Sequence, residues 1–215
     1  MNEFALLLAA TLASGTPLAI AGLGLLLNER AGVLNLGAEG MMLVAAIAGF
    51  ATAFLTGNDW LAFCAGAMAG ALMAGVFGVL VIWLNTNQYA TGLALSLFGG
   101  GFSAFVGAAW SGRKLGERSS YELPFLADLP FVGPAFFKQH PMVYIAIGFT
   151  FAMVWFLYRS RAGLVLRAIG ESPESAHSLG YKVRWIRLAA VMGGGALCGV
   201  AGPSCRLCTH PCGWK

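Results

Sequence analysis

Residues 28–42, N-E-R-A-G-V-L-N-L-G-A-E-G-M-M, form a polar, glycine-rich stretch between two long apolar runs. The stretch places Glu29, Arg30, Asn35 and Glu39 where the chain leaves or re-enters a hydrocarbon layer. Non-helical backbone at that depth is stable only where it is buried in protein or lines a watery cavity. Charged groups there face the protein interior, pair with one another or lie at the membrane boundary. The stretch is therefore a candidate for a pathway or gate; the alternative is a polar turn that only joins two helices.

Composition independently indicates a membrane protein. The chain is 58% hydrophobic and 10% charged, whereas soluble domains average about 45–50% and about 25%. Its 30 glycines suit helices that pack closely in lipid, where small residues let backbones approach. The net charge of +4 does not indicate nucleic-acid binding, because the basic residues gather in loops beside apolar spans. We therefore predict an all-α fold, a polytopic helical transmembrane bundle with about five to six spans.

Apolar runs predict where the spans lie, since a helix needs ~20 residues to cross a bilayer. They cover residues 4–27, 41–55, 61–84, 85–109 and 142–158, and a sixth run covers residues 188–201. The run at 41–55 is short unless part of the preceding signature is also helical. Pro17 predicts a kink or a break in the first span, and Gly66 and Gly70 form a G-x-x-x-G pair that favours close helix packing. In the sixth run, the glycines at 193–195 lower helical propensity, and residues 202–203, Gly-Pro, are expected to end it.

Residues 29–42 resemble the early signature of permease subunits in bacterial ABC importers for nucleosides, simple sugars and branched-chain amino acids. They are most similar to the nucleoside branch. Residues 87–97, N-Q-Y-A-T-G-L-A-L-S-L, resemble a second stretch of the same permeases, with Ser96 where the family pattern has Asn. The resemblance extends from Met1 to about Gly202.

This resemblance implies a multi-pass permease subunit in the bacterial inner membrane. Its expected partners are an ABC ATPase subunit, a second permease subunit, an extracytoplasmic solute-binding protein and the lipid bilayer. The expected solute is a nucleoside first, then a simple sugar, then a branched-chain amino acid. No cofactor and no nucleic acid are expected. The proline-rich stretch at 111–141 reads as an external loop, on the side where a binding protein docks in this family.

The segment 159–187 is rich in basic residues, which places it in the cytoplasm and the amino terminus outside. Within it, Ser172 suits an N-cap, Pro173 suits the first helical position, and Gly180 suits the left-handed position after a short helix. The sequence E-S-A-x-x-x-G resembles the E-A-A-x-x-x-G coupling motif of ABC permeases, which implies that Glu174, Ala176 and Gly180 contact the ATPase subunit. The alternative is an ordinary surface helix.

Four polar residues at the mouths of spans are candidates for the translocation pathway: Asn35, Glu39, Asn87 and Thr91. Amide, hydroxyl and carboxylate groups there can hydrogen-bond a polar solute. The residues at the start of the fourth span can equally cap its helix.

The chain ends in a cysteine-rich tail instead of further apolar segments. We therefore expect an incomplete transmembrane permease domain at 1–202, which includes the coupling loop at 159–187, and an atypical tail at 203–215. A truncated or frameshifted reading frame accounts for such a tail. Its Cys205, Cys208, His210 and Cys212 could bind zinc, but four ligands so close together leave little backbone to wrap an ion, and no metal site is predicted.

Two other classes compete with the permease interpretation. An intramembrane enzyme needs a nucleophile and a base, or a metal set, facing one another within the spans. No His lies within an apolar run, and Glu29 and Glu39 lack a third polar partner at a defined spacing. The chain also lacks the G-x-x-x-x-G-K-[ST] phosphate loop, so ATP hydrolysis is expected on a separate subunit. We therefore predict no catalytic residue; a nonfunctional membrane fragment is the third possibility.

Overall fold

The computed structural model describes residues 2–108 and 141–208, and within these ranges every regular element is an α-helix. This confirms the predicted all-α fold. The helices are α1 Asn2–Arg30, α2 Ala38–Thr56, α3 Asp59–Ile82, α4 Gln88–Ala108, α5 Pro141–Arg159, α6 Arg161–Glu171, α7 Pro173–Ser178 and α8 Val183–Cys208.

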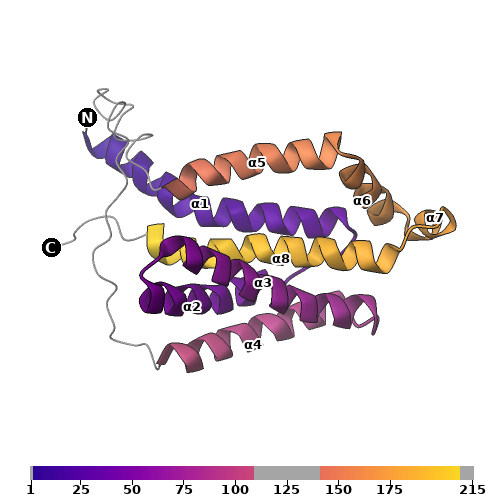
Figure 1. The fold of residues 1–215 in the computed structure, drawn as a ribbon, viewed down its shortest axis with the longest axis horizontal. Helices are drawn as coiled ribbons and strands as arrows, with labels where there is room; N and C mark the ends of the chain where they lie inside the picture. Colours follow the sequence, from indigo (N-terminus) through magenta and orange to yellow (C-terminus); the bar gives the residue numbers. More distant parts are fainter. Residues whose placement is uncertain (1, 109–140, 209–215) are drawn as a thin grey trace.

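The long helices form a bundle in which α8 lies centrally against α1, α2 and α3 (Figure 1). Helix α5 packs on the outer side of α1, and α4 packs on α2. The short helices α6 and α7 lie together at one end of the bundle, where α1 ends and α8 begins (Figure 1). This end therefore brings together the loop after α1 and the segment predicted to contact an ATPase.

Several helices are long and apolar enough to cross a bilayer. They are α2, α3, α4 and the part of α8 over Val183–Ser204. Helices α5 and α6 pass the same test only as a pair bent by 72°, and α1 has 29 residues, more than the ~20 that a span needs. The bundle is therefore polytopic, as predicted.

The bend between α5 and α6 is held by Ser160. Its hydroxyl donates to the Phe156 carbonyl oxygen at 2.6 Å and accepts a hydrogen bond from the Gly163 N–H at 3.0 Å. The hydroxyl thus serves both the end of α5 and the start of α6, where backbone groups lack helical partners. The sequence predicted a cytoplasmic loop over residues 159–187, and α6 within it was not predicted.

Glycines make the crossing between α3 and α8 possible. A Cβ atom on Gly66 would lie 2.7 Å from the Gly199 carbonyl oxygen, and one on Gly70 would lie 2.6 Å from the Gly199 Cα. Gly195 likewise faces the Gly70 carbonyl oxygen, which would lie 2.8 Å from its Cβ. The packing role predicted for the G-x-x-x-G pair is confirmed. Close backbone contact here compensates for the roughly 1 kcal/mol that each glycine costs in a helix.

The predicted end of the sixth apolar run is wrong. Helix α8 begins at Val183, before the run, and continues through Gly202 and Pro203 to Cys208. The Pro203 ring fits against two glycines: a Cβ on Gly66 would lie 2.6 Å from its Cγ, and Gly49 faces the same ring. The Ser204 hydroxyl donates to the Val200 carbonyl oxygen at 2.7 Å. Helix α8 thus continues through Pro203, which would break an isolated helix, because neighbouring helices pack on its ring and the Ser204 hydroxyl bonds the backbone.

Of the two alternatives at Pro17, a break is wrong, because α1 is helical from Asn2 to Arg30. The Thr16 hydroxyl donates to the Leu12 carbonyl oxygen at 2.7 Å in the preceding turn. The predicted external loop and most of the cysteine-rich tail lie outside the described residues, so docking of a binding protein and zinc binding stay untested.

Candidate functional site at the α6–α7 end of the bundle

The loop between α1 and α2, residues 31–37, is a tight turn. The Val33 N–H donates to the Asn28 carbonyl oxygen at 3.0 Å, and Gly32 has a φ of +76°, a conformation that glycine adopts without strain. Ala31 and Val33 are buried. The loop is therefore non-helical backbone fixed in protein, as the glycine-rich pattern suggests.

Asn35 organises this loop. Its side chain is buried, its Oδ1 accepts a hydrogen bond from the Gly37 N–H at 2.9 Å, and its Nδ2 lies 3.6 Å from the Met41 Sδ. Glu39 instead lies exposed in the first turn of α2. Asn35 is thus buried and stabilises the loop, whereas Glu39 is exposed. A role of either residue in the pathway stays a prediction.

The two stretches that carry the family resemblance contact each other. The Leu34 N–H donates to the Gln88 Oε1 at 2.8 Å. A Cβ on Gly92 would lie 3.0 Å from the Leu36 N, and one on Gly99 would lie 2.6 Å from the Gly40 Cα. The loop and the start of α2 therefore pack directly on α4, with glycines at the closest approaches.

Asn87 and Thr91 lie at the start of α4. The Asn87 Oδ1 accepts a hydrogen bond from the Tyr89 N–H at 3.0 Å, which is the geometry of a helix cap. The Thr91 hydroxyl donates to the Thr86 Oγ1 at 2.9 Å, and the Thr86 hydroxyl donates to the Leu80 carbonyl oxygen at 3.0 Å. Both residues thus stabilise the turn between α3 and α4, and their part in a pathway stays a prediction.

Helix α7 is the short helix that the sequence predicts, with Pro173 in its first turn. Ala176 is buried in a small apolar cluster with Ile169 and Val183. Gly180 has a φ of +86° and its N–H donates to the His177 carbonyl oxygen at 2.9 Å. Ser172 occupies the N-cap position, but its side chain makes no capping hydrogen bond.

The three coupling residues therefore have different surroundings. Ala176 attaches α7 to the bundle, whereas Glu174 and Gly180 are exposed. A short helix anchored on one side and exposed on the other can bind a partner through its free face.

The end of α6 joins α7 to the loop after α1. A Cβ on Gly170 would meet the Arg30 carbonyl oxygen and would lie 3.3 Å from the Gly32 N. The Arg187 Nη2, from α8, donates to the Ile169 carbonyl oxygen at 3.3 Å. The same nitrogen would lie 2.8 Å from a Cβ on Gly32. Arg187 and Gly170 thus link α6, α8 and the loop after α1. From the sequence, Arg187 counted only as one of the basic residues that place segment 159–187 in the cytoplasm.

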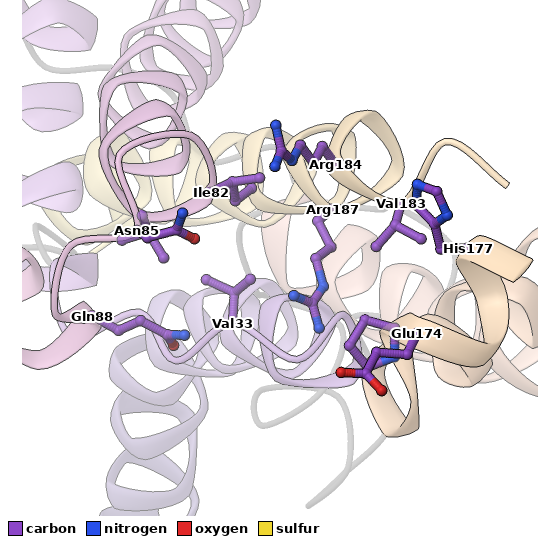
Figure 2. A pocket seen from close by; sticks show the side chains of 11 residues that line it. Val33, Ile82, Asn85, Gln88, Glu174, His177, Val183, Arg184 and Arg187 are labelled. Carbon is purple, nitrogen blue, oxygen red and sulfur yellow. The ribbon is translucent and has the colours of Figure 1, made fainter.

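A cavity of about 580 Å³ lies between the loop, the turn after α3, helix α7 and the start of α8 (Figure 2). Its lining includes Val33, Val81, Ile82, Asn85, Gln88, Pro173, Glu174, His177, Val183, Arg184 and Arg187. All three stretches that the sequence singled out therefore border one cavity. The sequence did not predict the contacts of Gln88 with Leu34 or of Arg187 with Ile169, because these partners lie far away in the chain.

The chain matches the family described as "Branched-chain amino acid transport system / permease component" over residues 7–205. It belongs to this family of permease components, which are transport components rather than enzymes, and it is a multi-pass protein of the plasma membrane. This establishes the class that the signature at residues 29–42 implied.

Relatives in this class carry different solute names. The chain is 44% identical to a putative glucose ABC transporter permease of Haloferax volcanii, covering 94% of this chain and 63% of the relative. It is 30% identical to a nucleoside ABC transporter permease of Lactococcus lactis subsp. cremoris, covering 94% and 67%. It is 28% identical to a guanosine ABC transporter permease of Bacillus subtilis, covering 90% and 64%.

The chain thus spans just under two thirds of the length of the glucose relative. No solved structure matches it.

Proposed function

We propose that this chain is a permease subunit of an ABC importer that translocates a small, uncharged polar solute, a simple sugar or a nucleoside. The names of its relatives support this solute class: glucose at 44% identity, nucleoside at 30% and guanosine at 28%. They add weight to the sugar alternative beside the nucleoside that the signature favours. A branched-chain amino acid remains the third candidate.

The proposed partners are an ABC ATPase subunit, a second permease subunit and an extracytoplasmic solute-binding protein. The α6–α7 end of the bundle is the proposed cytoplasmic face, because basic residues gather there, as expected for cytoplasmic loops. These residues are Arg30, Arg159, Arg161, Arg167, Lys182, Arg184 and Arg187. The proposed membrane domain comprises α1 through α8, so the expected boundary at residue 202 falls inside α8, and residues 159–187 are its proposed ATPase-facing region.

One observation carries the proposal, the continuous contact from α7 to the loop after α1. Ala176 packs on Ile169, whose carbonyl oxygen accepts from Arg187. The neighbouring Gly170 lies against the Arg30 backbone. The loop in turn donates to Gln88 at the start of α4. Because packed backbone transmits displacement, a push on α7 is passed to the loop after α1 and from there to the start of α4.

The proposed mechanism is alternating access. Closure of the ATPase domains displaces α7 through exposed residues that include Glu174 on α7 and Gly180 just after its end. The loop after α1 and the turn before α4 then shift together, because a hydrogen bond and close glycine contacts join them. Asn35, Glu39, Asn87 and Thr91 lie on these moving parts and are the proposed pathway residues.

Replacing Gly180 with Trp in a complex with its partners tests the coupling. A Cβ at Gly180 meets nothing within 4 Å, so the indole adds bulk just after α7 with no clash at its Cβ, although the φ of +86° strains the backbone of any residue other than glycine. We expect loss of solute uptake and loss of the stimulation of ATP hydrolysis by loaded binding protein. Unchanged uptake and unchanged stimulation of ATP hydrolysis would contradict a coupling role of α7.

Gly57 provides the matched control. It has a φ of +68°, close to the +86° of Gly180, and a Cβ there also meets nothing within 4 Å. It lies in the turn between α2 and α3, away from α7. Gly57→Trp carries the same backbone strain and should retain stimulation, which separates strain from coupling.

Uptake by proteoliposomes ranks the solutes. Labelled glucose, guanosine and leucine are supplied with ATP and the partner subunits. ATP-dependent uptake of glucose or guanosine, with no uptake of leucine, supports the proposed class. ATP-dependent uptake of leucine alone would overturn it.

A further inference from the structure

The cavity at the α6–α7 end carries more positive than negative groups. Two arginines, Arg184 and Arg187, line it, against one carboxylate, Glu174. Figure 2 shows the Arg187 side chain reaching from α8 into the space above Val33. The amides of Asn85 and Gln88 border the side opposite α7, and Arg184 lies on the rim.

Arg187 is incompletely satisfied by the protein. Its Nη2 makes one hydrogen bond, to the Ile169 carbonyl oxygen at 3.3 Å. Its Nε is buried and has no hydrogen-bond partner within the described part of the chain. A guanidinium group has five N–H donors, and a buried charged donor left unpaired is costly. Among the described residues no carboxylate pairs with this group.

We propose that this cavity is a binding site for a small phosphate-bearing anion. Arg187 holds the phosphate, since its planar fork of donors matches two phosphate oxygens. Arg184 adds positive charge at the rim, and Asn85 and Gln88 offer amide groups to hydroxyls on the remainder of the ligand. A volume of about 580 Å³ lies within the range of about 300–1,000 Å³ for small-molecule sites.

Two sources supply this chemistry, a soluble phosphate monoester and the headgroup of an anionic lipid. In both cases the ligand contacts α7, α8, the turn before α4 and the loop after α1, because residues from each line the cavity. Bound ligand therefore stabilises the chain by holding these elements together. On the proposed function, this would restrain α7 during the ATPase cycle, but binding itself is independent of transport.

The test measures binding to the purified chain in neutral detergent, by thermal unfolding and isothermal titration. The probes are glucose 6-phosphate, inorganic phosphate, glucose, and sodium chloride at matched ionic strength. We expect the two phosphates to raise the midpoint of unfolding and to bind, while glucose and chloride do neither. No difference between glucose 6-phosphate and matched chloride, together with no lipid effect in the second arm, would overturn the proposal.

Nanodiscs give the second arm. Discs of phosphatidylglycerol are compared with discs of phosphatidylcholine, each with and without glucose 6-phosphate. Stabilisation by phosphatidylglycerol that removes the effect of glucose 6-phosphate assigns the site to a lipid headgroup. Stabilisation by glucose 6-phosphate in both lipids assigns it to a soluble monoester.

Three variants locate the site. Arg187→Gln should weaken binding about tenfold or more, the loss expected for a charged hydrogen bond, and the rim variant Arg184→Gln about two- to threefold. The control is Arg159→Gln, which removes an exposed charge at the same end of the bundle but outside the cavity. If Arg187→Gln does not fold, Arg184→Gln against Arg159→Gln decides. Equal weakening by these two variants would show general screening and overturn the site.

Discussion

The close approach of α3 and α8 gives a stability prediction. At Gly199 of α8, a Cβ would meet the Gly66 carbonyl oxygen and lie 3.1 Å from the Ala67 Cα. Both neighbours are backbone atoms, so neither can rotate away. Gly199→Ala must therefore push α3 and α8 apart.

Two opposing terms set the size of this effect. Overpacking a tight site costs about 1–3 kcal/mol, whereas replacing a helical glycine with alanine contributes up to about 1 kcal/mol of helical propensity. At Gly22 of α1, a Cβ meets nothing within 4 Å, so Gly22→Ala gains the propensity without a clash. The difference between the variants isolates the overpacking term, about 1–3 kcal/mol in favour of Gly22→Ala.

The assay is reversible unfolding in mixed micelles of dodecyl sulfate and a neutral detergent, followed by circular dichroism. The free energies of unfolding of Gly199→Ala, Gly22→Ala and the parent chain are compared. We expect Gly22→Ala to be the most stable and Gly199→Ala the least. Equal stability of the two variants would refute the close crossing of α3 and α8.

Substitutions at three polar residues near the loop after α1 test what their side chains contribute. Asn28 is fully buried, and neither of its amide atoms has a partner among the described residues, so Asn28→Leu should not destabilise the chain and should gain up to ~2 kcal/mol in the same unfolding assay. Asn35 is buried but hydrogen-bonded, so Asn35→Leu should lose about 1–3 kcal/mol; equal effects of the two changes would contradict this contrast. Gln88→Ala removes the acceptor of the Leu34 N–H and should speed hydrogen exchange of that amide, an effect that Gln88→Glu should not produce.

The membrane spans could be predicted from the sequence because a bilayer imposes a length. An apolar run of ~20 residues has few alternatives to a helix, since its backbone must be hydrogen-bonded internally. The third predicted span, residues 61–84, corresponds to α3 at Asp59–Ile82, and the fifth, 142–158, to α5 at Pro141–Arg159. Helix α3 begins two residues before the predicted span because Asn58 caps it: the Asn58 side chain accepts a hydrogen bond from the Trp60 N–H.

The extent of α8 could not be predicted, because local propensity was overridden by its neighbours. The glycines at 193–195 and Pro203 argue against a helix in isolation. In the bundle, the glycines allow contact with α1 and α3, and the Pro203 ring fits against Gly66. That fit depends on residues more than a hundred positions away, which no periodic pattern reveals.

At the candidate site too, local features could be predicted from the sequence and long-range contacts could not. Helix α7 could be found from Pro173 and Gly180, since turn and cap residues act locally. The contacts of Arg187 with Ile169 and Gly32, and of Gln88 with Leu34, join distant parts of the chain. They became visible only once the helices were placed, and they join α6, on which α7 packs through Ala176, to the rest of the bundle.

An ATPase subunit is proposed to act on this chain through α7, and maleimide labelling in inverted membrane vesicles measures that contact. Ser175, exposed on α7, is replaced by Cys in a background whose five native cysteines are changed to Ala. Asn58→Cys, exposed at the α2–α3 turn, is the control at the opposite end.

We expect the ATPase subunit to slow labelling of Ser175→Cys and to leave Asn58→Cys unchanged. Equal labelling of Ser175→Cys with and without the ATPase subunit would contradict the proposed contact between α7 and that subunit.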